Sequence, residues 1–231
     1  MAVLILKNVS SEGPGTIEHY LAHRSIAFSV VDLHAGELIM STSRYDTLVM
    51  MGGPMSVNDE AEYPYLKREF ELTRKFIRGG KRVFGVCLGS QIMAKALGGK
   101  VYKGPAQEIG WLDIVLTGEA LRDPAVRSLS MHPDTGHANR TVTVFQWHGE
   151  TFTLPRGAVR LASSDLYPNQ AFRYGQRAYA FQFHIEVTKQ MVFEWLKNEP
   201  VDQAALKRAT EELYDIYNRR AFAFYDAFFR N

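Results

Sequence analysis

The sequence has one cysteine, Cys87, among its 231 residues, so no internal disulfide is available to the chain. It also lacks any apolar run near the roughly 20 residues that a membrane-spanning helix needs. Residues 1–7 carry no basic lead and no small-residue cleavage site, and we expect a first strand there rather than a signal peptide. These absences predict a cytoplasmic protein with no membrane partner.

An excess of charge of one sign is missing as well. The 27 Lys and Arg residues nearly balance the 25 Asp and Glu residues, which leaves a formal net charge of +2. No basic stripe stands out, so we expect no nucleic-acid partner. Internal repeats and low-complexity segments are also lacking, and the length allows one large domain or at most two. We expect a main domain over residues 1–199 and a C-terminal helical extension, residues 200–231, packed on the same domain.

The cysteine lies in the most informative segment, residues 83–91, where an apolar strand gives way to a helical pattern. Gly85 and Gly89 flank it in the G-x-Nuc-x-G pattern of a nucleophile elbow, with sulfur in place of the serine oxygen. Glycine at these positions removes the Cβ atoms that would collide in so tight a bend. The N-terminus of the following helix would favour the thiolate. The alternative is a buried structural cysteine, which is the usual fate of a lone Cys.

A second motif occupies residues 179–187. If this segment is a strand, alternation places His184 and Glu186 on the same face, so the carboxylate can orient the imidazole. Together with Cys87 these residues supply a nucleophile, a base and an orienting acid, the three roles of a catalytic triad. Without Cys87, a histidine on a strand is more often a structural residue.

The two segments together resemble the class I, triad-type glutamine amidotransferases, which pair a G-x-C-x-G elbow with a late F-H-x-E segment. A third matching feature is residues 48–56, an apolar strand that ends in a Gly-Gly-Pro turn. The resemblance covers residues 3–187. Ser90 stands where the family often has His, and Ile185 stands where Pro is common; neither position is a triad member.

The resemblance implies a mechanism. The thiolate of Cys87 would attack the γ-carboxamide carbon of glutamine, with His184 acting first as base and then as acid, through a γ-glutamyl thioester. Backbone N–H groups of Gly53 and Leu88 would hold the developing oxyanion. Ammonia would leave, and water would release glutamate.

Substrate contacts are also implied by the resemblance. They are Gly52, Gln91, Trp147, His148 and Gly149. A helix-surface amide at Gln91 and a merely structural loop around Trp147 and His148 are the alternatives. No cofactor is expected.

Strand and helix patterns alternate through the first half of the chain. Short apolar runs at residues 3–6, 27–31, 47–51 and 82–86 predict strands that are buried on both faces. Helical spacing predicts helices over residues 16–23 and 65–77. This order favours a parallel sheet with its sites at the carboxyl ends of the strands. The resemblance implies the flavodoxin-like α/β fold of class I amidotransferases, with three layers, a mainly parallel central sheet and flanking helices.

The second half is more β-like, with extra strands predicted at residues 100–103, 109–117, 141–146 and 159–163. Residues 130–140 are the most loop-like stretch. Its two histidines, His132 and His137, have no third ligand at a suitable spacing, so we expect no metal site.

After Pro200, apolar residues recur at intervals of three and four, which predicts a long amphipathic helix with an aromatic end. Packing of this helix on the protein's own body is one role. Contact with a second copy in a homodimer, or with a synthetase, is the other.

The closest resemblance is to the amidotransferase half of GMP synthetase, although nothing here resembles the S-G-G-x-D-S nucleotide loop of its ATP pyrophosphatase partner. We therefore predict a stand-alone amidotransferase-like cysteine hydrolase that acts on glutamine or a γ-glutamyl compound, as γ-glutamyl peptidase relatives do. One alternative is a glutaminase subunit that donates ammonia to a separate synthetase. Another is a non-catalytic regulatory or binding protein that keeps the fold. A protease or chaperone of the DJ-1 type also uses a cysteine elbow, but the late His-x-Glu pair favours the amidotransferase.

Overall fold

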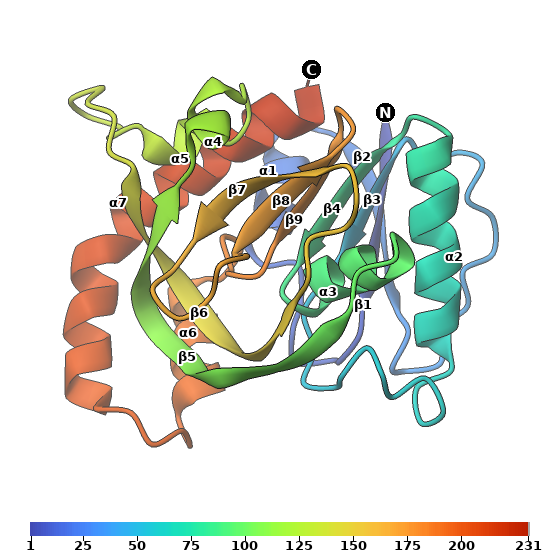
Figure 1. Ribbon diagram of the computed structural model, residues 1–231, viewed down its shortest axis with the longest axis horizontal. Coiled ribbons are helices and arrows are strands. Elements are labelled where there is room, and N and C mark those ends of the chain that lie inside the picture. Colours follow the sequence, from blue (N-terminus) through green and yellow to red (C-terminus); the bar gives the residue numbers. More distant parts are fainter. Residues whose placement is uncertain (231) are drawn as a thin grey trace.

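The computed structural model describes residues 1–230 and contains a nine-stranded sheet with the order β2-β1-β3-β4-β9-β8-β7-β5-β6 (Figure 1). The strands are β1 (Ala2–Lys7), β2 (Ala27–Asp32), β3 (Thr47–Met50), β4 (Arg82–Val86), β5 (Val101–Leu116), β6 (Thr141–Phe152), β7 (Ala158–Ser163), β8 (Ala171–Tyr174) and β9 (Ala178–Phe181). The helices are α1 (Thr16–His23), α2 (Tyr65–Arg78), α3 (Leu88–Ala96), α4 (Gly118–Arg122), α5 (Arg127–Ser130), α6 (Lys189–Leu196) and α7 (Gln203–Arg230).

The five strands β2, β1, β3, β4 and β9 are parallel and form the centre of the fold. The predicted strands and helices of the first half are confirmed, to within one or two residues at their ends. Because the strands are parallel, the carboxyl ends of β3, β4 and β9 lie next to one another. Any side chains that follow these three strands therefore meet at one edge of the sheet.

Helices cover both faces of the parallel strands, with α2 and α3 on one side and α1 and α7 on the other (Figure 1). Alternation along each strand divides the core between these two layers. In β1, Leu4 and Leu6 pack with the cluster of α2 and α3, whereas Val3 and Ile5 pack with the cluster of α1 and α7. The expected three-layer α/β arrangement is confirmed.

The strands β8, β7, β5 and β6 extend the sheet with antiparallel pairing. The separate strands predicted over residues 100–103 and 109–117 are wrong, because β5 runs through both as one strand. Its pairing with β6 shifts between Lys103 and Glu108, and this bulge interrupts the side-chain alternation that sequence reasoning depends on. Strand β6 also continues to Phe152, beyond the predicted end at residue 146.

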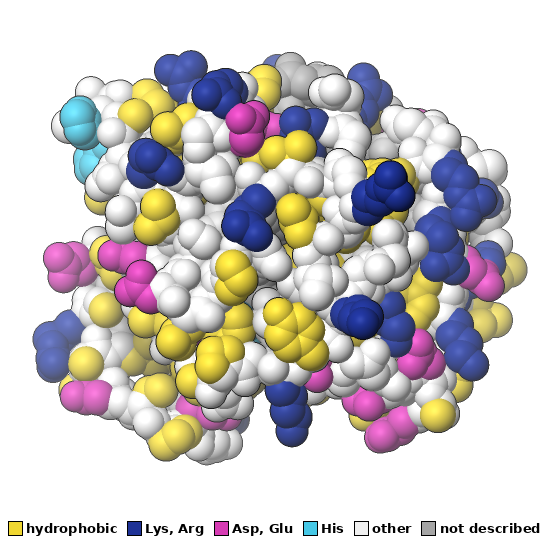
Figure 2. Space-filling model, in the orientation of Figure 1, with side chains coloured by type: hydrophobic (Ala, Val, Ile, Leu, Met, Phe, Trp, Pro, Cys, Tyr) yellow, Lys and Arg dark blue, Asp and Glu magenta, His cyan; other side chains and the backbone are white. Residues whose placement is uncertain are grey.

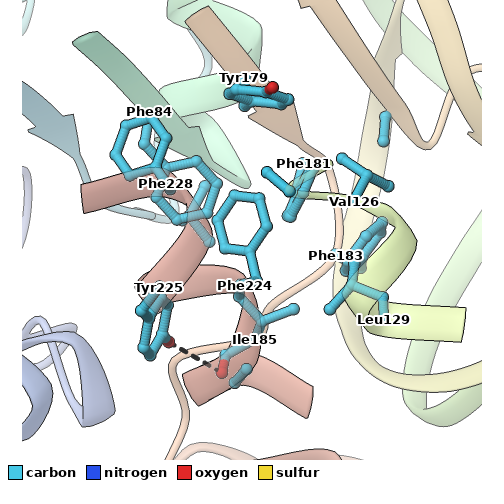
Figure 3. Close-up of a cluster of buried hydrophobic side chains, with 14 of the residues drawn as sticks. Phe84, Val126, Leu129, Tyr179, Phe181, Phe183, Ile185, Phe224, Tyr225 and Phe228 are labelled. Carbon is cyan, nitrogen blue, oxygen red and sulfur yellow. Dashed lines mark hydrogen bonds between the residues drawn. The ribbon is translucent and has the colours of Figure 1, made fainter. Parts of the chain in front are cut away.

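The predicted C-terminal helix is confirmed as α7, and α6 precedes it without having been predicted. Aromatic side chains of α7 pack on the central strands: the Phe224 ring lies 5.2 Å from that of Phe84 and 4.9 Å from that of Phe181 (Figure 3). The domain boundary between residues 199 and 200 stays a prediction. Within residues 1–230, none of the helices combines the length and apolarity needed to cross a membrane.

Candidate active site

Cys87 occupies the sharp turn between β4 and α3. Its backbone has φ 50° and ψ −108°, and Ser25 is the other non-glycine residue with a positive φ among residues 1–230. A Cβ added at Gly85 would overlap the carbonyl of Gly89, and one added at Gly89 would overlap the carbonyl of Met50. The strained backbone and the two close approaches are those of a nucleophile elbow.

The sulfur of Cys87 faces a cavity, although the residue is only 6% exposed. Its Sγ lies 3.8 Å from the carbonyl oxygen of Trp147 and 3.8 Å from Nε2 of Gln182. The Cys87 backbone N–H donates to the Phe181 carbonyl over 2.8 Å, which ties the elbow to the end of β9. The nucleophile candidate is therefore held from two neighbouring strands.

His184 and Glu186 lie beyond the end of β9, so the strand predicted through this segment is wrong. Strand β9 ends at Phe181, and His184 makes only an isolated bridge to Phe145, its N–H donating over 2.8 Å. The two side chains nevertheless meet, with 2.7 Å between His184 Nδ1 and Glu186 Oε1. Glu186 Oε2 accepts from the N–H of Ile185 over 2.9 Å. A proline at position 185 has no N–H and could not make this bond.

The imidazole of His184 is almost fully buried. Burial alone disfavours the charged form, but the Glu186 carboxylate and the nearby Cys87 sulfur outweigh it and raise the pKa of His184 well above 6.5. Nδ1 is engaged by Glu186, whereas Nε2 has no hydrogen-bond partner within residues 1–230. Nε2 is thus the imidazole nitrogen that Glu186 leaves free.

Helices α1, α6 and α7 hold the segment that carries His184 and Glu186. The Thr16 N–H at the start of α1 donates to the Glu186 carbonyl over 2.8 Å. From α7, the Tyr225 hydroxyl donates to the Ile185 carbonyl over 3.1 Å (Figure 3). The Trp195 ring of α6 packs edge-on to the imidazole at 5.2 Å between centroids. These contacts replace the sheet hydrogen bonds that a strand would have supplied.

The cavity in front of Cys87 has a volume of about 690 Å³. Six of the predicted site residues line it: Gly53, Cys87, Gln91, Trp147, His148 and Gly149. The other four are buried behind its wall: Gly52, Leu88, His184 and Glu186. The structure therefore brings all ten around one space.

The two predicted oxyanion donors are neighbours. A Cβ added at Gly53 would lie 3.0 Å from Cδ2 of Leu88, so the Gly-Gly-Pro turn after β3 sits directly on the elbow. Leu88 is the first residue of α3, where backbone N–H groups have no acceptor inside the helix. Gly53 and Leu88 thus both lie beside the turn that carries the sulfur.

Gln91 is a buried member of the site, so the alternative of a helix-surface amide is wrong. It is 4% exposed, and its Nε2 donates to Oε1 of Gln182 over 3.2 Å. Gln182 was missed by the sequence analysis, although it lies two residues before His184 in the same motif. The two glutamines are therefore joined to each other, and Gln182 also contacts the sulfur of Cys87.

Residues 147–149 belong to β6, so the alternative of a plain loop is wrong. Both imidazole nitrogens of His148 are engaged: Nδ1 lies 3.0 Å from the Glu150 carbonyl and Nε2 lies 3.0 Å from Oε2 of Glu108. Burial alone would raise the pKa of Glu108, but hydrogen bonds from His148, Ser164 and Gln170 hold it below its usual value. His148 therefore stiffens the cavity wall, and its partner Glu108 follows the bulge in β5.

Glu12 also lines the cavity and was missed. Its residue is 7% exposed, and its carboxylate packs against Gly52, opposite Cε1 of His184. Burial, assisted by the Glu186 charge and opposed by His184, raises the pKa of Glu12 to about 7. Glu12 belongs to no local motif. It comes near His184 only because the chain returns to this edge of the sheet more than 170 residues later.

Metal ligands do not cluster in the described part of the chain: residues 1–230 contain no group of three His, Cys, Asp or Glu side chains suited to an ion. His132 and His137 are joined by their backbones, the N–H of the first donating to the carbonyl of the second over 2.8 Å. They close a short exposed turn.

The strained turn that carries Cys87, the buried His184–Glu186 pair and the Gly-Gly-Pro turn after β3 therefore meet at one edge of the sheet. The model of the family described as glutamine amidotransferase class-I matches residues 13–200, and the chain belongs to this family. The expected family and fold are thereby confirmed.

The chain is similar to proteins described as glutamine amidotransferases and to part of a GMP synthase. The glutamine amidotransferase-like protein YfeJ of Salmonella typhimurium is 30% identical over 224 residues, covering 95% of this chain and 86% of that protein. A GMP synthase of Phenylobacterium zucineum is 34% identical over 154 residues, which is 65% of this chain but only 26% of that longer protein. The crystal structure of a glutamine amidotransferase from Thermotoga maritima superposes with a TM-score of 0.87 at 30% identity, covering 100% of this chain and 99% of that one.

Proposed function

We propose that this protein is a cysteine hydrolase that cleaves the γ-amide of glutamine or of a γ-glutamyl compound, with Cys87, His184 and Glu186 as its catalytic triad. The observation that carries the proposal is the common placement of these groups. A sulfur on a strained elbow and a buried histidine–carboxylate pair approach one cavity from neighbouring strand ends. Membership of the amidotransferase family supports the same chemistry.

In the first half-reaction, Cys87 Sγ gives its proton to Nε2 of His184 and attacks the γ-carbon, so a C–S bond forms and the carbonyl electrons move to oxygen. The N–H groups of Gly53 and Leu88 hold this oxyanion; loss of one such donor costs about 100- to 1,000-fold in rate. Collapse of the oxyanion breaks the C–N bond, and His184 delivers its proton to the departing nitrogen. Glu186 keeps the imidazole oriented and stabilises its charge.

In the second half-reaction, water loses a proton to Nε2 of His184 and attacks the thioester carbon. The C–S bond breaks, glutamate is released, and the proton returns to the sulfur of Cys87. No redox step and no external co-reactant other than water is needed. Cys87 and His184 therefore act in both half-reactions, and in each of them His184 first accepts a proton and then donates it.

The size of the cavity favours substrates beyond free glutamine. About 690 Å³ falls in the range of roughly 300–1,000 Å³ that encloses drug-sized ligands, and one amino acid would leave part of it empty. Contacts to the glutamate half would orient the carbonyl at Cys87 whichever amine departs. We infer that γ-glutamyl peptides or amides are cleaved at least comparably to glutamine.

Glutamate release from glutamine and from a panel of γ-glutamyl amides tests the proposal. We expect turnover by the wild-type protein and none above background by Cys87→Ala, with both proteins equally folded by circular dichroism. Turnover that survives Cys87→Ala would contradict the assignment of the nucleophile. Refusal of every γ-glutamyl peptide beside good hydrolysis of glutamine would restrict the function to a glutaminase.

A second candidate is an ammonia-donating subunit for a separate synthetase. The similarity to part of a glutamine-hydrolysing GMP synthase favours it. In that case glutamine hydrolysis would be weak for the isolated protein and would rise when the synthetase is added. Co-purification followed by this assay separates the two candidates.

A further inference from the structure

The leaving amine has a defined place in the cavity, provided that the proposed function holds. It must lie beside His184, because this imidazole delivers the proton to the departing nitrogen. The part of the wall next to His184 is therefore the leaving-group side. It is formed by the segment after β1, which carries Glu12, and by the segment after α6, which carries Glu199.

These two segments are tied to each other and to His184. The indole of Trp195 packs on the imidazole of His184 and donates from Nε1 to the Ser11 carbonyl over 3.3 Å. Ser11 immediately precedes Glu12, and Glu199 follows the end of α6. Both carboxyl groups thus border the same side of the cavity.

The two other carboxyl groups that line the cavity, those of Glu150 and Asp59, already have partners. Glu150 Oε1 accepts from the Ser56 hydroxyl over 3.1 Å and stands opposite Lys103 in the β5–β6 pairing. Asp59 accepts from the Ser56 N–H over 2.9 Å. By contrast, neither Glu12 nor Glu199 receives a hydrogen bond on its carboxyl group or forms an ion pair with any of residues 1–230. The unpartnered negative charge is therefore confined to the leaving-group side.

We propose that Glu12 and Glu199 form a leaving-group subsite that selects γ-glutamyl amides of amines carrying a second, positively charged group. Two carboxyl groups that accept no hydrogen bond and form no ion pair within residues 1–230 are complementary to an ammonium group brought by the substrate. In Figure 2 most acidic side chains of the visible face lie in its lower half, towards the carboxyl ends of the parallel strands, with basic side chains among them.

The ionisation of Glu12 makes this selection depend on pH. His184 and Glu186, beyond β9, act on its charge, and the other titratable groups of this part of the cavity are Cys87 on the elbow and Glu199 after α6. Since the pKa of Glu12 is raised to about 7, its carboxyl group is mostly neutral at pH 6 and mostly ionised at pH 8. Preference for a cationic amine therefore increases over this interval.

The test compares kcat/KM for γ-glutamyl-putrescine with that for γ-glutamyl-pentylamine, in which a methyl group replaces the terminal ammonium at equal chain length. We expect the cationic amide to be preferred by about tenfold at pH 8, the effect of one charge pair in a partly screened site, and by less at pH 6. Glu12→Gln and Glu199→Gln should each lower the ratio several-fold. Glu194→Gln, an exposed acid on α6, is the matched control and should leave the ratio unchanged.

Equal kcat/KM values for the two amides, with glutamine or the neutral amide still turned over, would overturn the subsite while leaving the proposed function standing. A Glu12→Gln variant that slows both amides by the same factor would assign Glu12 to the glutamate half and would also overturn it. If Cys87-dependent hydrolysis is absent for both amides and for glutamine, the proposed function and the subsite fail together. If Glu12→Gln does not fold, the ratio of kcat/KM values in Glu199→Gln still tests the subsite.

Discussion

The two halves of the candidate site are built in different ways. The elbow around Cys87 is made locally, by one strand, one turn and one helix, and its conformation depends on two glycines within two residues of the sulfur. The segment of His184 and Glu186 has no regular structure of its own. Its backbone is held by hydrogen bonds to α1 and α7 and by the Trp195 ring of α6.

Because the two regions are held in different ways, we expect substitutions in them to have different effects. The elbow is fixed by the contacts between β3, β4 and α3, so short-range packing sets the position of Cys87, the proposed nucleophile. His184, the proposed base, is held by helices that lie far away in the chain, so tertiary packing sets its distance from the sulfur. We expect changes near Cys87 to act on the nucleophile directly, and changes in α7 to act on the base while sparing the elbow.

The largest effect is expected from removal of the base. His184→Ala eliminates the group that moves a proton in both half-reactions, and kcat should fall by about 1,000-fold or more, toward the upper end of general acid–base contributions. Glu186→Gln alters only orientation and charge stabilisation, so it should retain more activity than His184→Ala. Near wild-type rates for both variants in the glutamate-release assay would contradict the triad.

Gly89→Ala should disrupt the elbow around Cys87. The added Cβ would overlap the Met50 carbonyl, and the backbone must shift, which we expect to lower the free energy of unfolding by about 3 kcal/mol. Labelling of Cys87 by a thiol reagent should slow or become heterogeneous. Gly118→Ala is the control, because its Cβ would have Arg122 Nη2 at 3.9 Å as its nearest neighbour. Chemical denaturation should show equal stability for Gly118→Ala and the wild type; equal stability for Gly89→Ala would contradict the close approach.

A smaller effect is expected from Tyr225→Phe in α7. The change removes the hydroxyl that donates to the Ile185 carbonyl and contacts Thr16, at a cost of about 1 kcal/mol. Turnover should fall several-fold because the base segment loosens, while thiol labelling at Cys87 stays at the wild-type rate. Tyr174→Phe is the control, since the Tyr174 hydroxyl forms no hydrogen bond within residues 1–230. Parallel loss of labelling and turnover in Tyr225→Phe would show that the two regions are not separable.

The same difference explains which features could be predicted from the sequence. The G-x-C-x-G pattern and the apolar strands of the first half are local signals, and they predicted β4, α3 and the position of Cys87. The pairing of His184 with Glu186 was expected from strand alternation, yet the pair forms on an irregular segment whose conformation depends on α7. Glu12 and Glu108 were not predicted from the sequence. Glu12 comes near His184 only when the segment after β9 packs beside it, and Glu108 follows a bulge in β5.

The central claim is that Cys87 is the covalent nucleophile of this site, and covalent capture tests it most directly. A glutamine analogue with an electrophilic γ-carbon should add once per chain, and mass spectrometry of the digested protein should place the adduct on Cys87. Cys87→Ala should remain unlabelled, and glutamine should protect the wild type. Failure of the folded wild-type protein to react, with its thiol no more reactive than that of a free cysteine, would contradict the account.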